Sequence, residues 1–324
     1  MANAVTSLRE GTNFVHLVGK LEENNLEKVT VDKKNVIRGN LIIGTDTDKK
    51  FKVNFYVNEF TASGAESKAY KSLNAVVDEY VSRAKALNEG LGENDISVVE
   101  IKGGFSVNDF ISKKTGEIIT ELNIRSMFPN RIMGDYEPKA EFEVETYFET
   151  IEDEVDENGA PTGRVKIVGY LPIYGGQVIP ITMYTATDNN YVNVGDYIKS
   201  NYKTGKTGKV RGYLNCTAKT TTYIKEGFGA PSSERTFTTF AFEPIINDGD
   251  KEQYAITDVK NFDKASIKAA ILYREEQLEQ KKNKSNASVS NAGFNSSPTS
   301  NSNSFASPVN SSSTTNTDVD EIDF

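Results

Sequence analysis

The sequence contains a single cysteine, Cys216, a single histidine, His16, and no tryptophan among its 324 residues. One cysteine excludes a disulfide framework within the chain and a cysteine-based zinc site, and it fits a reducing compartment. No apolar run approaches the length needed to cross a bilayer, and the first residues lack the apolar run of a signal peptide. We therefore expect a soluble cytoplasmic protein with no membrane contact.

The net charge of −9 argues against nucleic-acid binding until its distribution is considered. Residues 140–160 hold nine acids and no Lys or Arg, and the segment from Ser285 onward holds four acids and no base. Taking these nine and four from the 46 acids leaves 33 acids against 37 Lys and Arg residues. The body of the chain is therefore mildly basic, which permits nucleic-acid binding without requiring it.

Period-two alternation of apolar residues over 13–60, clearest in FKVNFYV at 51–57, predicts strands with one buried face. Apolar residues at helical spacing over 66–88 predict a helix. Strands resume at 96–105 and 117–128. Three strands, a helix and two further strands make the element order of the five-stranded OB barrel.

A second, looser copy of this order follows. FVHLVGKL at 14–21 and RVKIVGYL at 164–171 share the pattern V-x-[LI]-V-G-x-L. Further strand candidates lie at 177–188, 209–224 and 235–246, and a short segment replaces the long helix. We therefore expect a mainly β chain of two tandem OB-like barrels, the first with a long helix between its third and fourth strands.

The end of the chain differs in composition, because nineteen of the last forty residues are Ser or Asn. Such a segment buries too little apolar surface to offset its ordering entropy, so we expect disorder. The expected organisation is a first OB-like unit (1–135), an acidic connecting segment that is partly strand (136–160), a second OB-like unit (161–257), a C-terminal helix (258–284), a disordered Ser/Asn linker (285–317) and an acidic tip (318–324).

The acidic tip, DVDEIDF, follows the polar linker as a compact motif. The ring and α-carboxylate of Phe324 can enter a small basic pocket on a partner, while the acids steer the encounter. The linker raises the concentration of that partner near the barrels. The alternative is a solvated acidic terminus that aids solubility, but the combination of acids with Ile322 and Phe324 favours partner binding.

This layout resembles that of bacterial single-stranded-DNA-binding proteins, which combine an OB fold, a polar linker and an acidic tip ending in Phe. The whole chain looks like a phage protein of this class, which implies a role in DNA replication, recombination and repair in the host cytoplasm. The tip here has Asp323 where a Pro is usual. In the family the tip recruits replication and repair enzymes and can compete with DNA. The resemblance implies a partner-binding motif of Asp318, Asp320, Glu321, Ile322, Asp323 and Phe324.

The alternation of inward and outward residues along each strand predicts where DNA would bind. OB barrels hold single strands across the outer face of their middle strands, where cations meet phosphates and flat rings stack on bases. The alternative is an ordinary solvated sheet face. Phe51 and Phe55, with Phe237 and Phe240, are expected in the core, and the basic loop at 200–212 could be a mobile phosphate clamp. The candidate nucleic-acid-binding residues are Lys20, Arg38, Lys52, Tyr56, Lys166, Tyr170, Tyr184, Lys206, Lys209, Arg211 and Tyr213.

Catalysis is not expected. G-K-T-G-K at 205–209 fails the spacing of a phosphate-binding loop, and no strand-to-helix context follows it. His16 lies in a predicted strand and has no nucleophile motif beside it, so we expect a structural role. We therefore expect a protein that is not an enzyme and needs no cofactor or metal. Two rival hypotheses are a structural or adaptor β protein that binds another protein, and an RNA-binding OB protein.

Overall fold

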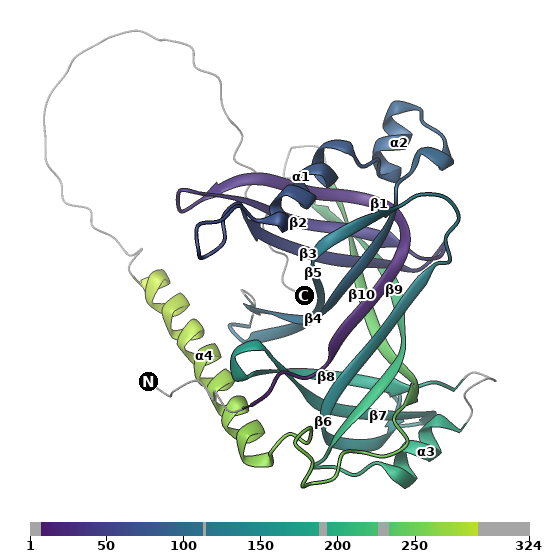
Figure 1. The fold of residues 1–324 in the computed structure, drawn as a ribbon, viewed down its shortest axis with the longest axis vertical. Coiled ribbons are helices and arrows are strands. Elements are labelled where there is room, and N and C mark those ends of the chain that lie inside the picture. Colours follow the sequence, from purple (N-terminus) through teal and green to yellow (C-terminus); the bar gives the residue numbers. More distant parts are fainter. Residues whose placement is uncertain (1–7, 113–114, 188–192, 226–232, 291–324) are drawn as a thin grey trace, which may run out of the picture. The chain divides into compact units, whose positions relative to one another are not determined.

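The computed structural model describes residues 8–112, 115–187, 193–225 and 233–290, which are mainly β, as predicted (Figure 1). The strands are β1 (Asn13–Val31), β2 (Lys34–Gly44), β3 (Lys50–Asn58), β4 (Val98–Ile111), β5 (Ile118–Ile132), β6 (Lys139–Val155), β7 (Pro161–Ile173), β8 (Gln177–Thr185), β9 (Thr207–Lys225) and β10 (Ser233–Gly249). The helices are α1 (Lys68–Glu79), α2 (Arg83–Glu89), α3 (Val194–Asn201) and α4 (Lys264–Ser290), with 3-10 turns η1 (Glu93–Asp95) and η2 (Tyr174–Gly176). The acidic tip and the expected linker beyond residue 290 lie outside the described residues.

The first five strands pair in a circuit that returns to its starting strand, and we call this unit barrel 1. β1 pairs with β2, β2 with β3, β3 with β5, β5 with β4, and β4 again with β1. β3 and β5 run parallel, and α1 and α2 lie between β3 and β4 in the chain. This is the OB arrangement that the order of elements predicts.

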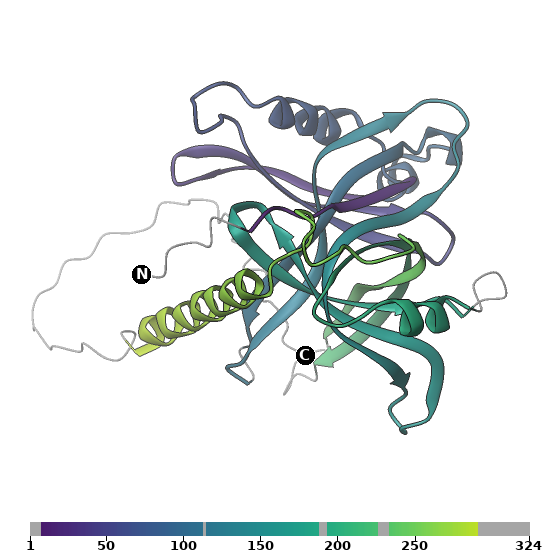
Figure 2. The ribbon, with the colours of Figure 1, turned by 60° about the horizontal axis from the view of Figure 1, so that its bottom comes forward.

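Strands β6 to β10 repeat the same circuit, and we call this unit barrel 2 (Figure 2). β6 pairs with β7, β7 with β8, β8 with β10, β10 with β9, and β9 with β6. In barrel 2 the parallel pair is β8 with β10, and the helix α3 lies between β8 and β9 in the chain. In barrel 1 the corresponding features are the parallel pair β3 with β5 and the helix α1. The strands of the two barrels therefore correspond one to one.

The acidic stretch at 136–160, expected to be a connecting segment, contains β6, the first strand of barrel 2. Phe142, Val144 and Phe148 on this strand are at most 2% exposed and belong to the core. Alternate positions carry acids such as Glu141 and Glu143. Here the period-two alternation of apolar residues, and not the density of acids, indicates the structure.

The repeated octapeptide does not mark corresponding strands. FVHLVGKL lies in β1, the first strand of its circuit, whereas RVKIVGYL lies in β7, the second strand of the other circuit. Each copy has a glycine where another strand approaches closely. A Cβ added to Gly19 would lie 2.2 Å from the Gly44 carbonyl oxygen, and one added to Gly169 would lie 2.4 Å from Thr146 Cγ2. The prediction of two OB-like barrels is right, but the corresponding strands differ from those that the octapeptide suggests.

The helix expected over 66–88 is two helices, because Ser82 begins a new one. The Ser67 side chain accepts from Tyr70 N at the start of α1, and the Ser82 side chain accepts from Lys85 N at the start of α2. Such capping side chains satisfy backbone donors at a helix N-terminus. At the other end of the chain, α4 extends to Ser290, past the expected start of the linker at 285.

One hydrophobic core runs through both barrels. β1 pairs with β6 from Asn13–Val144 to Val18–Lys139, so the two circuits share one ten-stranded sheet. Phe105 of barrel 1 packs against Phe142 and Phe242 of barrel 2. Because one core and one sheet hold both circuits, the surfaces of the two barrels have fixed positions on one body.

By their contacts, residues Met1–Asn108 and Leu122–Arg274 form one compact unit that contains both barrels. Asp109–Glu121 and Glu275–Phe324 form a second unit, in which the Thr120 hydroxyl donates to Asp109 Oδ1 at 2.6 Å. Among the helices of the described ranges, none is long and apolar enough to cross a membrane.

Candidate nucleic-acid interface

The outer side of β2, β3 and β5 forms one surface, which we call face 1. Strand register places Arg38 of β2 opposite Tyr56 of β3, and Asn54 of β3 opposite Arg125 of β5. The intervening residues of β3 are buried in the core, so Lys52 and Tyr56 point outward. Face 1 consists of Arg38, Asn40, Lys52, Asn54, Tyr56 and Arg125.

The cations of face 1 differ in how they are neutralised. Arg38 Nε lies 2.7 Å from Glu27 Oε1, on the exposed part of the β1–β2 hairpin. Lys52 and Arg125 are exposed, and in the described part of the chain no carboxylate lies within ion-pair distance of either. Face 1 can therefore offer two cations to an incoming anion without breaking an existing ion pair.

Exposed rings and one exposed apolar side chain accompany these cations. Tyr56 is 44% exposed, and Phe60, just beyond the end of β3, is 56% exposed. Met127, two residues after Arg125 on β5, is 54% exposed. Flat rings beside cations are the combination that single-stranded nucleic acids require.

The outer side of β7, β8 and β10 corresponds to face 1, and together with the carboxylates of the adjacent strand β6 we call it face 2. Its central residue, Arg164, makes a bidentate pair with Glu154, with Nε–Oε2 and Nη2–Oε1 distances of 2.5 and 2.6 Å. Arg164 Nη1 also lies 3.1 Å from Glu243 Oε2, and its guanidinium carbon lies 4.3 Å from the Tyr184 ring centroid. Lys166 Nζ lies 3.1 Å from Glu152 Oε1. Face 2 consists of Glu152, Glu154, Arg164, Lys166, Tyr184 and Glu243.

The ion pairs and the burial of face 2 shift the pKa values of several of its groups. Hydrogen bonds from Arg164 lower the pKa of Glu154, although burial opposes this change. The hydrogen bond that Lys166 donates to Glu152 raises the pKa of Lys166. Burial raises the pKa of Tyr184. These shifts favour the charged forms of Glu154 and Lys166, which strengthens their ion pairs.

The residues predicted to form a loop clamp are part of a strand. β9 begins at Thr207, so Lys209 and Arg211 lie on β9, where their side-chain nitrogens are 2.6 and 2.7 Å from the two oxygens of Glu143. Arg211 also reaches Asp250 Oδ1 at 3.0 Å. The pKa of Glu143 is lowered because hydrogen bonds from Lys209 and Arg211 outweigh its burial. A mobile loop is therefore not the right description of Lys209 and Arg211.

Three other predicted contact residues are partly buried. Tyr170 packs against a small core cluster that includes Tyr147 and Phe262. Tyr213 lies on β9 opposite Glu141 of β6. Half-buried Lys206 precedes β9, and its carbonyl accepts from a β6 backbone N–H. These positions leave less side-chain surface for a ligand than Lys52 and Tyr56 have.

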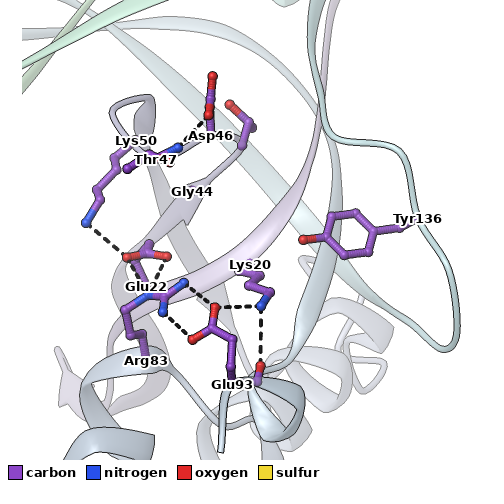
Figure 3. Close-up of a pocket in the computed structure, with 10 residues that line it drawn as sticks. Lys20, Glu22, Gly44, Asp46, Thr47, Lys50, Arg83, Glu93 and Tyr136 are labelled. Atoms are coloured by element: carbon purple, nitrogen blue, oxygen red, sulfur yellow. Dashed lines mark hydrogen bonds and ion pairs between the residues drawn. The ribbon is translucent and has the colours of Figure 1, made fainter.

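Lys20 lies in a pocket of about 530 Å³ beside the β2–β3 turn (Figure 3). Lys20 Nζ lies 2.6 Å from Glu93 Oε1, and Arg83 contacts both Glu93 and Glu22 at 2.5 and 2.9 Å. Lys50 pairs with Glu22 from the other side, at 3.0 Å. Hydrogen bonds from Arg83 and Lys20 lower the pKa of Glu93 to about 2. This network ties α2 and η1 to barrel 1.

The aromatic residues predicted for the core fall into three groups. Phe51 and Phe55 are 0% and 3% exposed, as predicted. Phe240 is partly buried against the core, and the side chain of Phe237 lies outside the described residues. His16 lies on β1, the strand of barrel 1 that pairs with β6 of barrel 2, and its Nε2 lies 3.0 Å from Glu100 Oε1 on β4.

Comparison with known protein families assigns this chain to one family. A family model described as YorF matches residues 12–284. The chain belongs to the YorF family. The match covers both barrels and most of α4, and it stops before the Ser/Asn-rich segment. No curated protein matches the chain.

Two solved structures similar to this YorF-family chain are of the single-stranded DNA binding protein from Thermus aquaticus. The wild-type structure has 11% sequence identity and a TM-score of 0.44, and the alignment covers 78% of this chain and 98% of the other. A deletion mutant of the same protein has 11% identity and a TM-score of 0.43, with 77% and 99% covered. A Replication Protein A heterotrimer bound to ssDNA has 13% identity and a TM-score of 0.17, with 73% and 49% covered.

Arg125, Met127 and Phe60 of this YorF-family chain were not among the predicted contact residues, although the structure exposes them on or beside face 1. Arg125 follows the buried Ile124 in the strand predicted at 117–128, so alternation there could have placed it outward. Phe60 lies outside any strand, and no pattern in the sequence separates it from a core aromatic. Among the residues that the structure describes, no group of three His, Cys, Asp or Glu side chains could hold a metal ion.

Proposed function

We propose that this protein binds and coats single-stranded DNA during phage replication, recombination and repair, and that it is not an enzyme. The observation that carries the proposal is face 1, where Lys52 and Arg125 lie unpaired among the described residues beside the exposed ring of Tyr56. Cations neutralise phosphates and rings stack on bases, and neither contact reads sequence. Because OB barrels present this surface to single strands, the fold and the side chains support the same function.

Titration with oligothymidine tests this function. We expect binding at low salt that weakens as salt rises, with a slope of about −0.7 in log affinity for each neutralised phosphate. Single-stranded RNA and duplex DNA of the same length are the comparison ligands. Absence of oligothymidine binding at low salt would contradict the proposal and favour a protein-binding adaptor, and tighter binding to RNA would favour an RNA-binding protein.

The proposal includes recruitment of replication and recombination proteins by Asp318, Asp320, Glu321, Ile322, Asp323 and Phe324, at a cytoplasmic site of DNA replication. The support is the sequence: four acids, Ile322 and Phe324 follow a Ser/Asn-rich segment. An acidic motif on a long tether can reach a basic pocket while the barrels hold DNA.

Deleting residues 318–324 is expected to abolish capture of partner proteins from host extract while oligothymidine affinity stays equal or rises. Affinity can rise because four acids that repel phosphates are lost. A deletion of seven linker residues, 303–309, is the control and should retain capture. If the 318–324 deletion lost DNA binding, the assignment of the tip to protein partners would be wrong.

A further inference from the structure

Faces 1 and 2 occupy corresponding places in two circuits of the same strand order, yet their charges differ. Face 1 with its neighbour Glu27 has three cations, Arg38, Lys52 and Arg125, and one carboxylate. Among the side chains that the structure describes, face 2 has two cations, Arg164 and Lys166, and three carboxylates. Duplication of the fold has therefore not produced two equivalent surfaces.

The ion pairs of face 2 hinder phosphate binding in two ways. A phosphate must displace carboxylates that are already held in place, including the bidentate Glu154 at 2.5 and 2.6 Å from Arg164. The surplus carboxylate also gives the cluster a net negative charge, which repels a polyanion. On face 1, no carboxylate of the described ranges presents either obstacle at Lys52 or Arg125.

The rings differ in the same direction. The outer side of Tyr56 is open, with 44% of the residue exposed. Tyr184 of face 2 is half-buried, and the Arg164 guanidinium lies over its ring, 4.3 Å from the centroid. A base that stacked on that side of Tyr184 would have to displace Arg164, which two carboxylates hold in place.

We propose that single-stranded DNA binds face 1 alone, and that Glu152, Glu154 and Glu243 exclude it from face 2. This inference rests on the proposed function and restricts it: one of the two barrels contacts DNA through its outer face, and the other barrel supports it through the shared sheet. The three carboxylates are determinants of where DNA binds and not catalytic groups.

Matched substitutions on the two faces test the inference in the full-length protein, with oligothymidine as the probe. Lys52→Ala and Arg125→Ala should each reduce affinity and make the salt slope about 0.7 shallower, because each removes one phosphate contact. Lys166→Ala should leave both quantities unchanged. Tyr56→Ala should lower affinity by about 5- to 150-fold, the range found when a base-stacking ring is removed.

A gain-of-binding variant completes the test. Glu152→Gln frees Lys166 from its carboxylate without removing packing, and it should raise oligothymidine affinity and steepen the salt slope. Thermal unfolding checks that each variant is folded. If Lys166→Ala weakens binding as much as Lys52→Ala, or if Lys52→Ala has no effect, the inference that DNA binds face 1 alone is overturned. The proposed function would still stand after either result. If the unmodified protein fails to bind oligothymidine at low salt, the proposed function itself fails.

Discussion

Replacing Gly39 with alanine is expected to destabilise the protein by more than about 4 kcal/mol, a large part of the 5–15 kcal/mol that typically keeps a domain folded. Gly39 lies on β2 with a φ of +125°, a backbone conformation that residues with a Cβ rarely adopt. An added Cβ would lie 2.0 Å from the Asn25 carbonyl oxygen and 3.1 Å from Leu26 Cα. Both are backbone atoms of β1, paired in register with β2, so neither can swing away.

Gly64→Ala is the matched control for this substitution. Gly64 also has a positive φ, +81°, but no described heavy atom lies within 4 Å of the position of an added Cβ. The control therefore carries the conformational strain alone, about 1–2 kcal/mol. Urea unfolding of both variants separates strain from collision. Equal losses in the two variants would show that the close approach of β1 to β2 is not a constraint on the fold.

The fold was predictable where one face of a strand is apolar and the other is polar. The alternation of Phe51, Val53 and Phe55 with polar residues gives β3 and its orientation directly. The acidic segment at 136–160 was predicted to be partly strand, but its place as the first strand of barrel 2 was not predicted, because acids such as Glu141 and Glu143 alternate with its core residues Phe142 and Val144. Charge density reports the solvent side of a strand, whereas alternation reports the strand itself.

The candidate site was predictable only in part, because the partners of its cations come from several strands. Glu152 pairs opposite Lys166 in the β6–β7 hairpin, so recognition of that hairpin would have revealed the ion pair. Glu243 contacts Arg164 from β10, 79 residues further along the chain, and only closure of barrel 2 brings the two together. The alternation along a strand shows which cations point outward. The tertiary structure decides whether a carboxylate from another strand already pairs with them.

Glu145 is a buried carboxylate whose removal should lower stability strongly. It lies on β6 and is 8% exposed. Its oxygens accept from Tyr254 Oη at 2.6 Å, Arg9 Nη1 at 3.0 Å and Thr12 N at 2.8 Å. These contacts tie the segment before β1 and the segment after β10 to barrel 2. Burial alone would raise the pKa of Glu145, but the hydrogen bonds from Tyr254, Arg9 and Thr12 lower it from 4.5 to about 2.

This shift makes stability depend on pH in a defined direction. Because the pKa of Glu145 is lower in the folded state than in the unfolded state, the carboxylate stabilises the fold fully above about pH 4.5. The contribution is lost as pH falls through about 2, where the folded protein also binds the proton. At neutral pH it amounts to about 3 kcal/mol.

Glu145→Gln should therefore lower the free energy of unfolding by about 3 kcal/mol at pH 7, and the difference from the unmodified protein should shrink as pH falls from about 4.5 toward 2. Urea unfolding at a series of pH values measures both quantities. Glu149→Gln, at an exposed position on the same strand, is the control and should change stability little at any pH. A difference for Glu145→Gln that stayed constant across this range would mean that lost packing, and not the carboxylate charge, accounts for the effect.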